Sequence, residues 1–182
     1  MLYYIHGYQS SPNSAKAKLF REKLDVKAIE YRHGNPEELV ISDCLKRIAK
    51  EIEEDREAVL IGSSLGGFLA AEIALESSFI KSLVLLNPLL IPPSQDLNAI
   101  KGIPVRILYE LRDDRLFMDK IRSDTTILMA TDDELLPRSW ILEFAMAQEA
   151  TVRFLHDDHS FTHHLGMLPR IIHKITKESG VD

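Results

Sequence analysis

The run Gly62-Ser63-Ser64-Leu65-Gly66 is the part of this sequence whose residue types and spacing most directly suggest chemistry. It follows a short apolar stretch patterned as a strand and precedes a stretch patterned as a helix. Glycines two residues before and after Ser64 allow a sharp strand-to-helix turn that exposes the serine at the edge of a sheet. The free N–H groups of the helix favour a developing negative charge. We therefore predict Ser64, rather than its neighbour Ser63, as a nucleophile.

A serine nucleophile needs a base near neutral pH, and that base needs a carboxylate that orients it. In a strand–turn–helix site the expected chain order is serine, acid, histidine. Adjacent carboxylates occur in Thr131-Asp132-Asp133-Glu134, just past an apolar strand pattern. The spacing to Pro137 favours Asp133 as the acid, and Asp132 is the alternative. One of these carboxylates could instead cap the helix that follows.

The candidate base lies in the run His156-Asp157-Asp158-His159-Ser160-Phe161, which follows the last predicted strand. Its second half resembles the Asp-His-x-Phe segment that carries the catalytic histidine of many hydrolases, so we predict His159 as the base. The ordinary interpretation of His156, His163 and His164 is that they are solvated or capping residues.

Two backbone N–H groups are needed to stabilise an oxyanion on the attacked carbonyl. We expect one from Leu65, which directly follows Ser64. The other is expected in the turn His6-Gly7-Tyr8-Gln9, after the first predicted strand. Tyr8 is the preferred donor and Gln9 is the alternative, while His6 is expected to shape the loop.

Elements of the right kind surround these residues, because apolar runs alternate with amphipathic ones. Strands are predicted at residues 2–5, 26–31, 58–61, 83–86, 126–130 and 152–155. Helices are predicted from Asn13 or Ser14 to about 24, from Pro36 to about 54, and at about 68–76, 137–147 and 165–176. This alternation predicts one α/β domain over residues 1–182, with helices on both faces of a mostly parallel, doubly wound sheet of about six strands.

Residues 89–124 interrupt the alternation and are predicted to form a small cap over the carboxyl edge of the sheet. The segment contains apolar residues that would favour an apolar acyl chain as substrate. These residues are Leu89, Leu90, Ile91, Leu108, Leu111, Leu116, Phe117 and Met118.

Composition excludes several classes of partner. The 182 residues are 45% hydrophobic and 27% charged, with a net charge of −6 and no basic run, which argues against nucleic acid and membrane surfaces. The single cysteine, Cys44, cannot form an internal disulfide. No signal peptide or spanning segment is apparent, so we expect a cytoplasmic monomer or small homo-oligomer that binds a small molecule and needs no cofactor.

A family resemblance rests on the motifs already described together with two further pieces. These are the N-terminal block from Tyr4 to Ala17 and the tripeptide Leu86-Asn87-Pro88. The sequence resembles the YqiA-type esterases, which are short bacterial α/β-hydrolases. The resemblance implies a fold that starts at what is usually the third strand, and hydrolysis of carboxylic esters or acyl thioesters.

The sequence leaves two other functions open. The cluster of histidines and aspartates at residues 156–164 has the composition of a metal site, although no His-Glu-x-x-His occurs and we predict no metal. A non-catalytic binding protein that keeps this fold is the second alternative. The presence of all three triad residue types in the expected order weighs against it.

Overall fold

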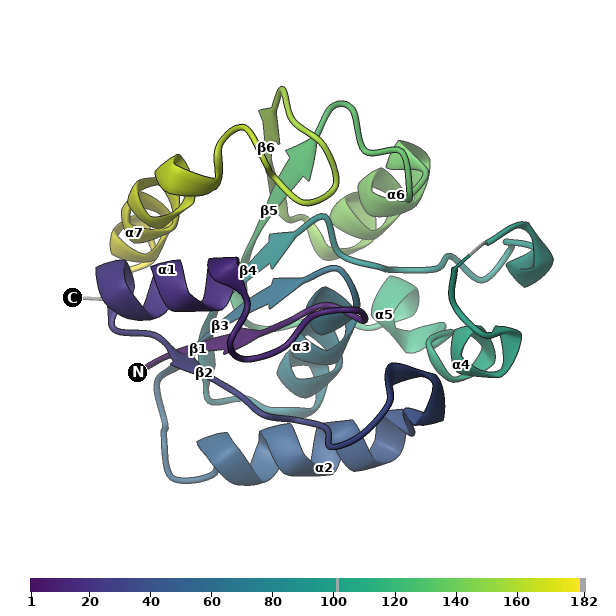
Figure 1. Cartoon of the computed structure of the whole chain (residues 1–182), viewed down its shortest axis with the longest axis horizontal. Coiled ribbons are helices and arrows are strands. Elements are labelled where there is room, and N and C mark those ends of the chain that lie inside the picture. Colours follow the sequence, from purple (N-terminus) through teal and green to yellow (C-terminus); the bar gives the residue numbers. More distant parts are fainter. Residues whose placement is uncertain (101, 181–182) are drawn as a thin grey trace.

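A parallel sheet forms the middle layer of the molecule (Figure 1). The structure is a computed structural model that describes residues 1–100 and 102–180. Residues 101 and 181–182 belong to the predicted domain, and residue 101 also to the predicted cap, but they lie outside the described residues. The six strands are arranged in the order β2-β1-β3-β4-β5-β6. They are β1 (Leu2–Ile5), β2 (Lys27–Ala28), β3 (Ala58–Ser63), β4 (Ile80–Leu86), β5 (Asp124–Ala130) and β6 (Thr151–Leu155).

Helices cover both faces of the sheet (Figure 1). On one face, α1 (Ala15–Leu24) packs against α7 (Leu168–Glu178), and their buried residues share a cluster. The other face carries α2 (Ile41–Ile52), α3 (Leu65–Glu76) and α6 (Arg138–Gln148), whose buried residues join a second, larger cluster. This three-layer arrangement confirms the predicted α/β class with a doubly wound sheet. No helix in the part of the chain that the structure describes is long and apolar enough to cross a membrane.

Two predicted elements differ most from the structure in their bounds, and β4 and α3 each begin three residues earlier than predicted. The strand expected at residues 26–31 pairs with β1 over only the two residues of β2. The helix expected from Pro36 begins five residues later, at Ile41. Pro36 instead opens the 3-10 turn η1 (Pro36–Glu38), because proline suits the first turn of either helix type. Leu39 then takes an extended ψ of 135°, which ends the turn.

The described part of residues 89–124 contains three short helical elements rather than a separate core. They are the 3-10 turn η2 (Leu97–Ala99), α4 (Val105–Glu110) and α5 (Arg115–Met118). Six of the eight apolar residues expected to favour an apolar acyl chain are at most 1% exposed and belong to the main core: Leu89, Leu90, Ile91, Leu108, Leu111 and Leu116. Because these side chains stabilise the fold, they do not support that substrate preference.

The carboxyl ends of parallel strands lie at one edge of a sheet, where open α/β folds place their sites. The loop with Gly7 and Tyr8 follows β1, Ser64 follows β3, and Asp133 follows β5. The segment with His159 follows β6. The fold therefore brings the four predicted parts of the site to the same edge.

Candidate active site

Ser64 lies at the sharp turn between β3 and α3, in a conformation that L residues rarely adopt. Its φ is 54° and its ψ is −118°. A non-glycine residue in such a region costs on the order of 1–3 kcal/mol, so the surrounding structure must hold it. The Ser64 N–H donates to the Leu86 carbonyl at 3.0 Å, and the Leu89 N–H donates to the Ser64 carbonyl at 3.0 Å. The turn is thus fastened to β4 and to the segment that follows it.

The glycines around Ser64 are required by close backbone packing. A Cβ added to Gly66 would lie 2.0 Å from the Ile5 carbonyl oxygen and 2.6 Å from that of His6. A Cβ on Gly62 would lie 2.4 Å from the Gly66 carbonyl oxygen. Without these side chains, the start of α3 can pack directly against the end of β1. This contact brings the β1 loop beside the serine.

The β1 loop places a peptide group next to Ser64. A Cβ on Gly7 would be 3.3 Å from the Ser64 Cβ. The carbonyl oxygen of Gly7 lies 2.9 Å from the His6 Nδ1, and the Ser10 N–H donates to it at 3.2 Å. Since a trans peptide points its C=O and N–H in opposite directions, these contacts fix the direction of the Tyr8 N–H. At Leu65, the first residue of α3, the N–H has no acceptor within the helix.

His6 is held as a neutral ring inside this loop. Burial lowers its pKa to about 4, and its ring stacks on Tyr31 with centroids 4.4 Å apart. Because a carbonyl oxygen only accepts, the His6 Nδ1 must carry the proton in the contact with Gly7. The Tyr31 hydroxyl donates to the His6 carbonyl at 3.0 Å, which ties the loop to the segment after β2.

His159 and Asp133 form a close, shielded pair. The His159 Nδ1 lies 2.7 Å from the Asp133 Oδ2, and the two side chains are 12% and 6% exposed. The other carboxylate oxygen, Oδ1, accepts the N–H groups of Leu135 and Leu136 at 2.9 and 3.0 Å. Hydrogen bonds to both oxygens therefore orient the carboxylate.

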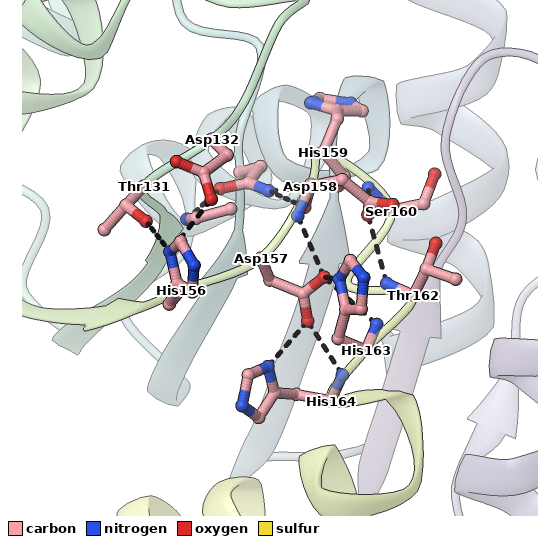
Figure 2. A network of polar contacts seen from close by, with 12 residues as sticks. Thr131, Asp132, His156, Asp157, Asp158, His159, Ser160, Thr162, His163 and His164 are labelled. Carbon is pink, nitrogen blue, oxygen red and sulfur yellow. Dashed lines mark hydrogen bonds and ion pairs between the residues drawn. The ribbon is translucent and has the colours of Figure 1, made fainter.

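The alternative acid, Asp132, lies at the surface. Its side chain is 58% exposed and its Oδ2 is 2.9 Å from the Nδ1 of His156, which is itself 87% exposed (Figure 2). Thr131 contacts the same ring nitrogen at 3.1 Å. Since His159 pairs with Asp133, the geometry favours Asp133 over Asp132 as the residue that orients His159.

Asp157 organises the loop that carries His159, as Figure 2 shows. Its side chain is buried, and its Oδ1 accepts the N–H groups of Asp158 and His163 at 2.8 and 3.1 Å. Its Oδ2 accepts the N–H of His164 at 2.8 Å. The Nδ1 atoms of His163 and His164 lie 3.0 and 2.8 Å from these two oxygens.

This arrangement bears on the metal alternative. Carboxylate oxygens of Asp157 and Asp158 and a nitrogen of His163 lie within 4.8 Å of one another. However, both oxygens of Asp157 already accept backbone N–H groups. Burial alone raises the pKa of Asp157, but the hydrogen bonds from His163, His164 and Asp158 outweigh it and hold that pKa well below its usual range. The geometry thus fits an ionised acceptor inside the loop better than a cation ligand.

Asn87 is a residue of this site that sequence reasoning did not assign. It follows β4, has a φ of 41° and is fully buried. Its Nδ2 donates to the His159 carbonyl at 3.0 Å, and its Oδ1 accepts the Ala130 N–H at 2.8 Å. Asn87 therefore connects the His159 loop to the ends of β4 and β5. The available signal was a polar residue placed directly after a wholly apolar strand end.

Structural comparison identifies the class of fold. The ferulic acid complex of Est1E from Butyrivibrio proteoclasticus is similar with a TM-score of 0.81 and 17% identity, over 100% of this chain and 89% of that one. Mouse alpha/beta hydrolase domain-containing protein 10 has a TM-score of 0.73 and 18% identity, over 97% and 89%. The meta-cleavage product hydrolase of Pseudomonas fluorescens IP01 has a TM-score of 0.70 and 14% identity, over 98% and 90%. The chain has the α/β-hydrolase fold.

Sequence comparison identifies the family. The model of the uncharacterised protein family UPF0227 matches residues 1–176. The chain therefore belongs to this family, the YqiA-like one, which confirms the resemblance inferred from the motifs. None of the curated proteins matches the chain.

Proposed function

We propose that this chain is a serine hydrolase that cleaves carboxylic esters or acyl thioesters through an acyl-enzyme. The observation that carries the proposal is the shielded His159–Asp133 pair, 2.7 Å apart, at the sheet edge that also presents the strained Ser64. An imidazole whose Nδ1–H is bound by a carboxylate exposes an unprotonated Nε2, which is the form that can take a proton from a serine.

The mechanism follows from these roles. His159 Nε2 takes the Ser64 proton as Ser64 Oγ attacks the carbonyl carbon, and the carbonyl oxygen becomes an oxyanion stabilised by the N–H groups of Tyr8 and Leu65. Collapse of this intermediate breaks the bond to the leaving group, which receives the proton from His159. A water molecule that gives a proton to His159 then attacks the acyl carbon. The bond from that carbon to Ser64 Oγ breaks as His159 returns the proton to Ser64, and the acid is released. Asp133 holds the histidine tautomer throughout.

A hollow beside the β1 loop offers room for part of a small substrate. It has a volume of about 490 Å³ and is bordered by Tyr8 and Gln9, by the turn at Asn35–Glu37, and by Gly102–Pro104. Its position next to the proposed N–H donor supports a small-molecule ester or thioester as the partner. Ferulic acid is the ligand of the similar Est1E structure, and its methyl ester is a useful probe.

The test is a panel of p-nitrophenyl esters and acyl-CoA thioesters of graded chain length, with covalent labelling by a fluorophosphonate. We expect the label on Ser64, its loss in Ser64→Ala, and its retention in Ser63→Ala. Turnover should fall by about 10⁴- to 10⁶-fold in Ser64→Ala. Folded wild-type protein that neither hydrolyses the panel nor takes the label would refute the proposal, as would near-normal turnover by Ser64→Ala.

A further inference from the structure

Lys16 is a partly buried lysine whose charge is not used in any of the proposed catalytic steps. It lies in α1, on the side of the sheet that α1 and α7 cover. Its Nζ is 3.3 Å from the Ser63 Oγ, and the Ser63 side chain is buried. Lys16 is therefore bonded to the residue that directly precedes the proposed nucleophile.

The same ammonium group also touches the loop of the proposed base. Its Nζ lies 5.5 Å from the centre of the Phe161 ring, within the range of a cation–π interaction. Phe161 is fully buried, has a φ of 58°, and donates its N–H to the Asp158 carbonyl at 3.1 Å. Phe161 lies two residues after His159, so a contact on its ring acts on the segment that carries His159.

The electrostatic surroundings of Lys16 are mixed. Burial lowers its pKa to about 8, while the carboxylates of Asp158 and Asp157 oppose that change. An ammonium that loses hydration in this way costs folding free energy relative to an apolar side chain of the same length. A methionine at this position would fill the same space without that cost.

We propose that Lys16 is a positioning residue, whose ammonium, held between the Ser63 hydroxyl and the Phe161 ring, sets the separation of Ser64 and His159. The inference rests on the proposed function, since it assigns Lys16 to the same site. It also accounts for three features that the triad leaves unexplained. These are the lysine of the N-terminal block, Ser63 before the proposed nucleophile, and the phenylalanine of the Asp-His-x-Phe segment.

The test compares Lys16→Met with Lys16→Arg, and uses Lys18→Met, an exposed lysine on the same helix, as the matched control. We expect Lys16→Met to lower kcat by about tenfold to a hundredfold with KM within twofold, because small misplacements of reacting groups are costly. Its Tm should stay equal to or exceed that of the wild type. Lys16→Arg should recover most of the activity, and Lys18→Met should match the wild type.

A pH profile provides a readout that a purely structural role would not change. The wild type should lose kcat above about pH 8, as Lys16 releases its proton, whereas Lys16→Arg stays charged and should keep its activity. The acidic groups that face Lys16 are Asp157 and Asp158, both of which remain ionised at that pH. The same alkaline loss in Lys16→Arg would overturn the proposal.

Further outcomes separate this inference from the function on which it rests. A lower Tm of Lys16→Met with unchanged kcat would show a structural role only and would overturn the inference. If Lys16→Met does not fold, Ser63→Ala decides, because it removes only the hydroxyl partner and should lower kcat by about tenfold. Unchanged kcat in Ser63→Ala would also overturn it. Absence of fluorophosphonate labelling in the wild type would instead refute the proposed hydrolase function.

Discussion

Replacement of Asp133 by asparagine tests whether Asp133, rather than Asp132, holds the tautomer of His159. In the native structure Asp133 Oδ1 accepts two backbone N–H groups and Oδ2 faces the His159 Nδ1. An asparagine must keep its oxygen toward the two N–H groups, because its amide nitrogen cannot accept them. The amide nitrogen then occupies the place of Oδ2, 2.7 Å from the His159 Nδ1.

The consequence is a change of protonation at His159. Two donors cannot face each other at that distance, so the proton leaves Nδ1 and resides on Nε2. A protonated Nε2 cannot accept the Ser64 proton. The corresponding change in a serine protease triad lowers kcat by about 10⁴-fold, which is about 5.4 kcal/mol of transition-state stabilisation. We expect a loss of the same order in Asp133→Asn, with little change in Tm.

The assay is steady-state hydrolysis of p-nitrophenyl acetate, with the rate of fluorophosphonate labelling as a second measure of Ser64 reactivity. Asp132→Asn is the matched control. Because Asp132 is exposed and contacts only surface groups, its replacement should change kcat by less than threefold. The reasoning fails if Asp133→Asn retains kcat within tenfold of the wild type, or if Asp132→Asn shows the larger loss.

Two further predictions concern stability. Gly66→Ala should destabilise the fold by about 3 kcal/mol or more in urea unfolding, because its Cβ would lie 2.0 Å from a backbone oxygen. The control is Gly166→Ala, whose Cβ would meet nothing within 4 Å and which should be nearly neutral. Equal effects of the two substitutions would contradict the packing argument. Burial, together with the nearby Asp113, raises the pKa of Glu72 from 4.5 to about 7 despite Arg115. Between these two pH values the native state binds more protons than the unfolded state, so the stability of the fold falls as the pH rises from 4.5 to 7. Glu72→Gln should therefore be more stable at pH 8 by up to about 3 kcal/mol, and a difference that does not shrink toward pH 4.5 would argue against this cause.

Much of the fold was accessible from the sequence because the patterns involved are local. Apolar runs identified the strands, and the two glycines flanking Ser64 identified the turn. Both patterns depend only on residues that are close together in the sequence. The loops of Asp133 and His159 were likewise recognisable because each directly follows a strand. Their meeting depends on parallel strand order, which alternating elements predict.

The contributions of Asn87 and Lys16 were not accessible in this way. Asn87 bonds to a carbonyl 72 residues later, and Lys16 bonds to a hydroxyl 47 residues later. Neither contact leaves a periodic pattern or a fixed residue spacing in the sequence. The substrate preference inferred from the apolar residues of 89–124 was not supported for a related reason. Composition alone does not distinguish a core side chain from one that lines a substrate site.

The packing of α1 against α7 has a consequence for the order in which this molecule acquires its parts. Phe161, beside the proposed base, shares its cluster with Phe20 of α1 and Ile172 of α7. The turn at Ser64 depends on β1, β3 and β4, all of which precede residue 90. A refolding chain can therefore form the turn at Ser64 early, whereas the loop that carries His159 gains the last of its support when α7 docks across the whole length of the sequence, a slow long-range step. Recovery of hydrolysis during refolding would then mark that last docking event, and it would lag behind the recovery of secondary structure.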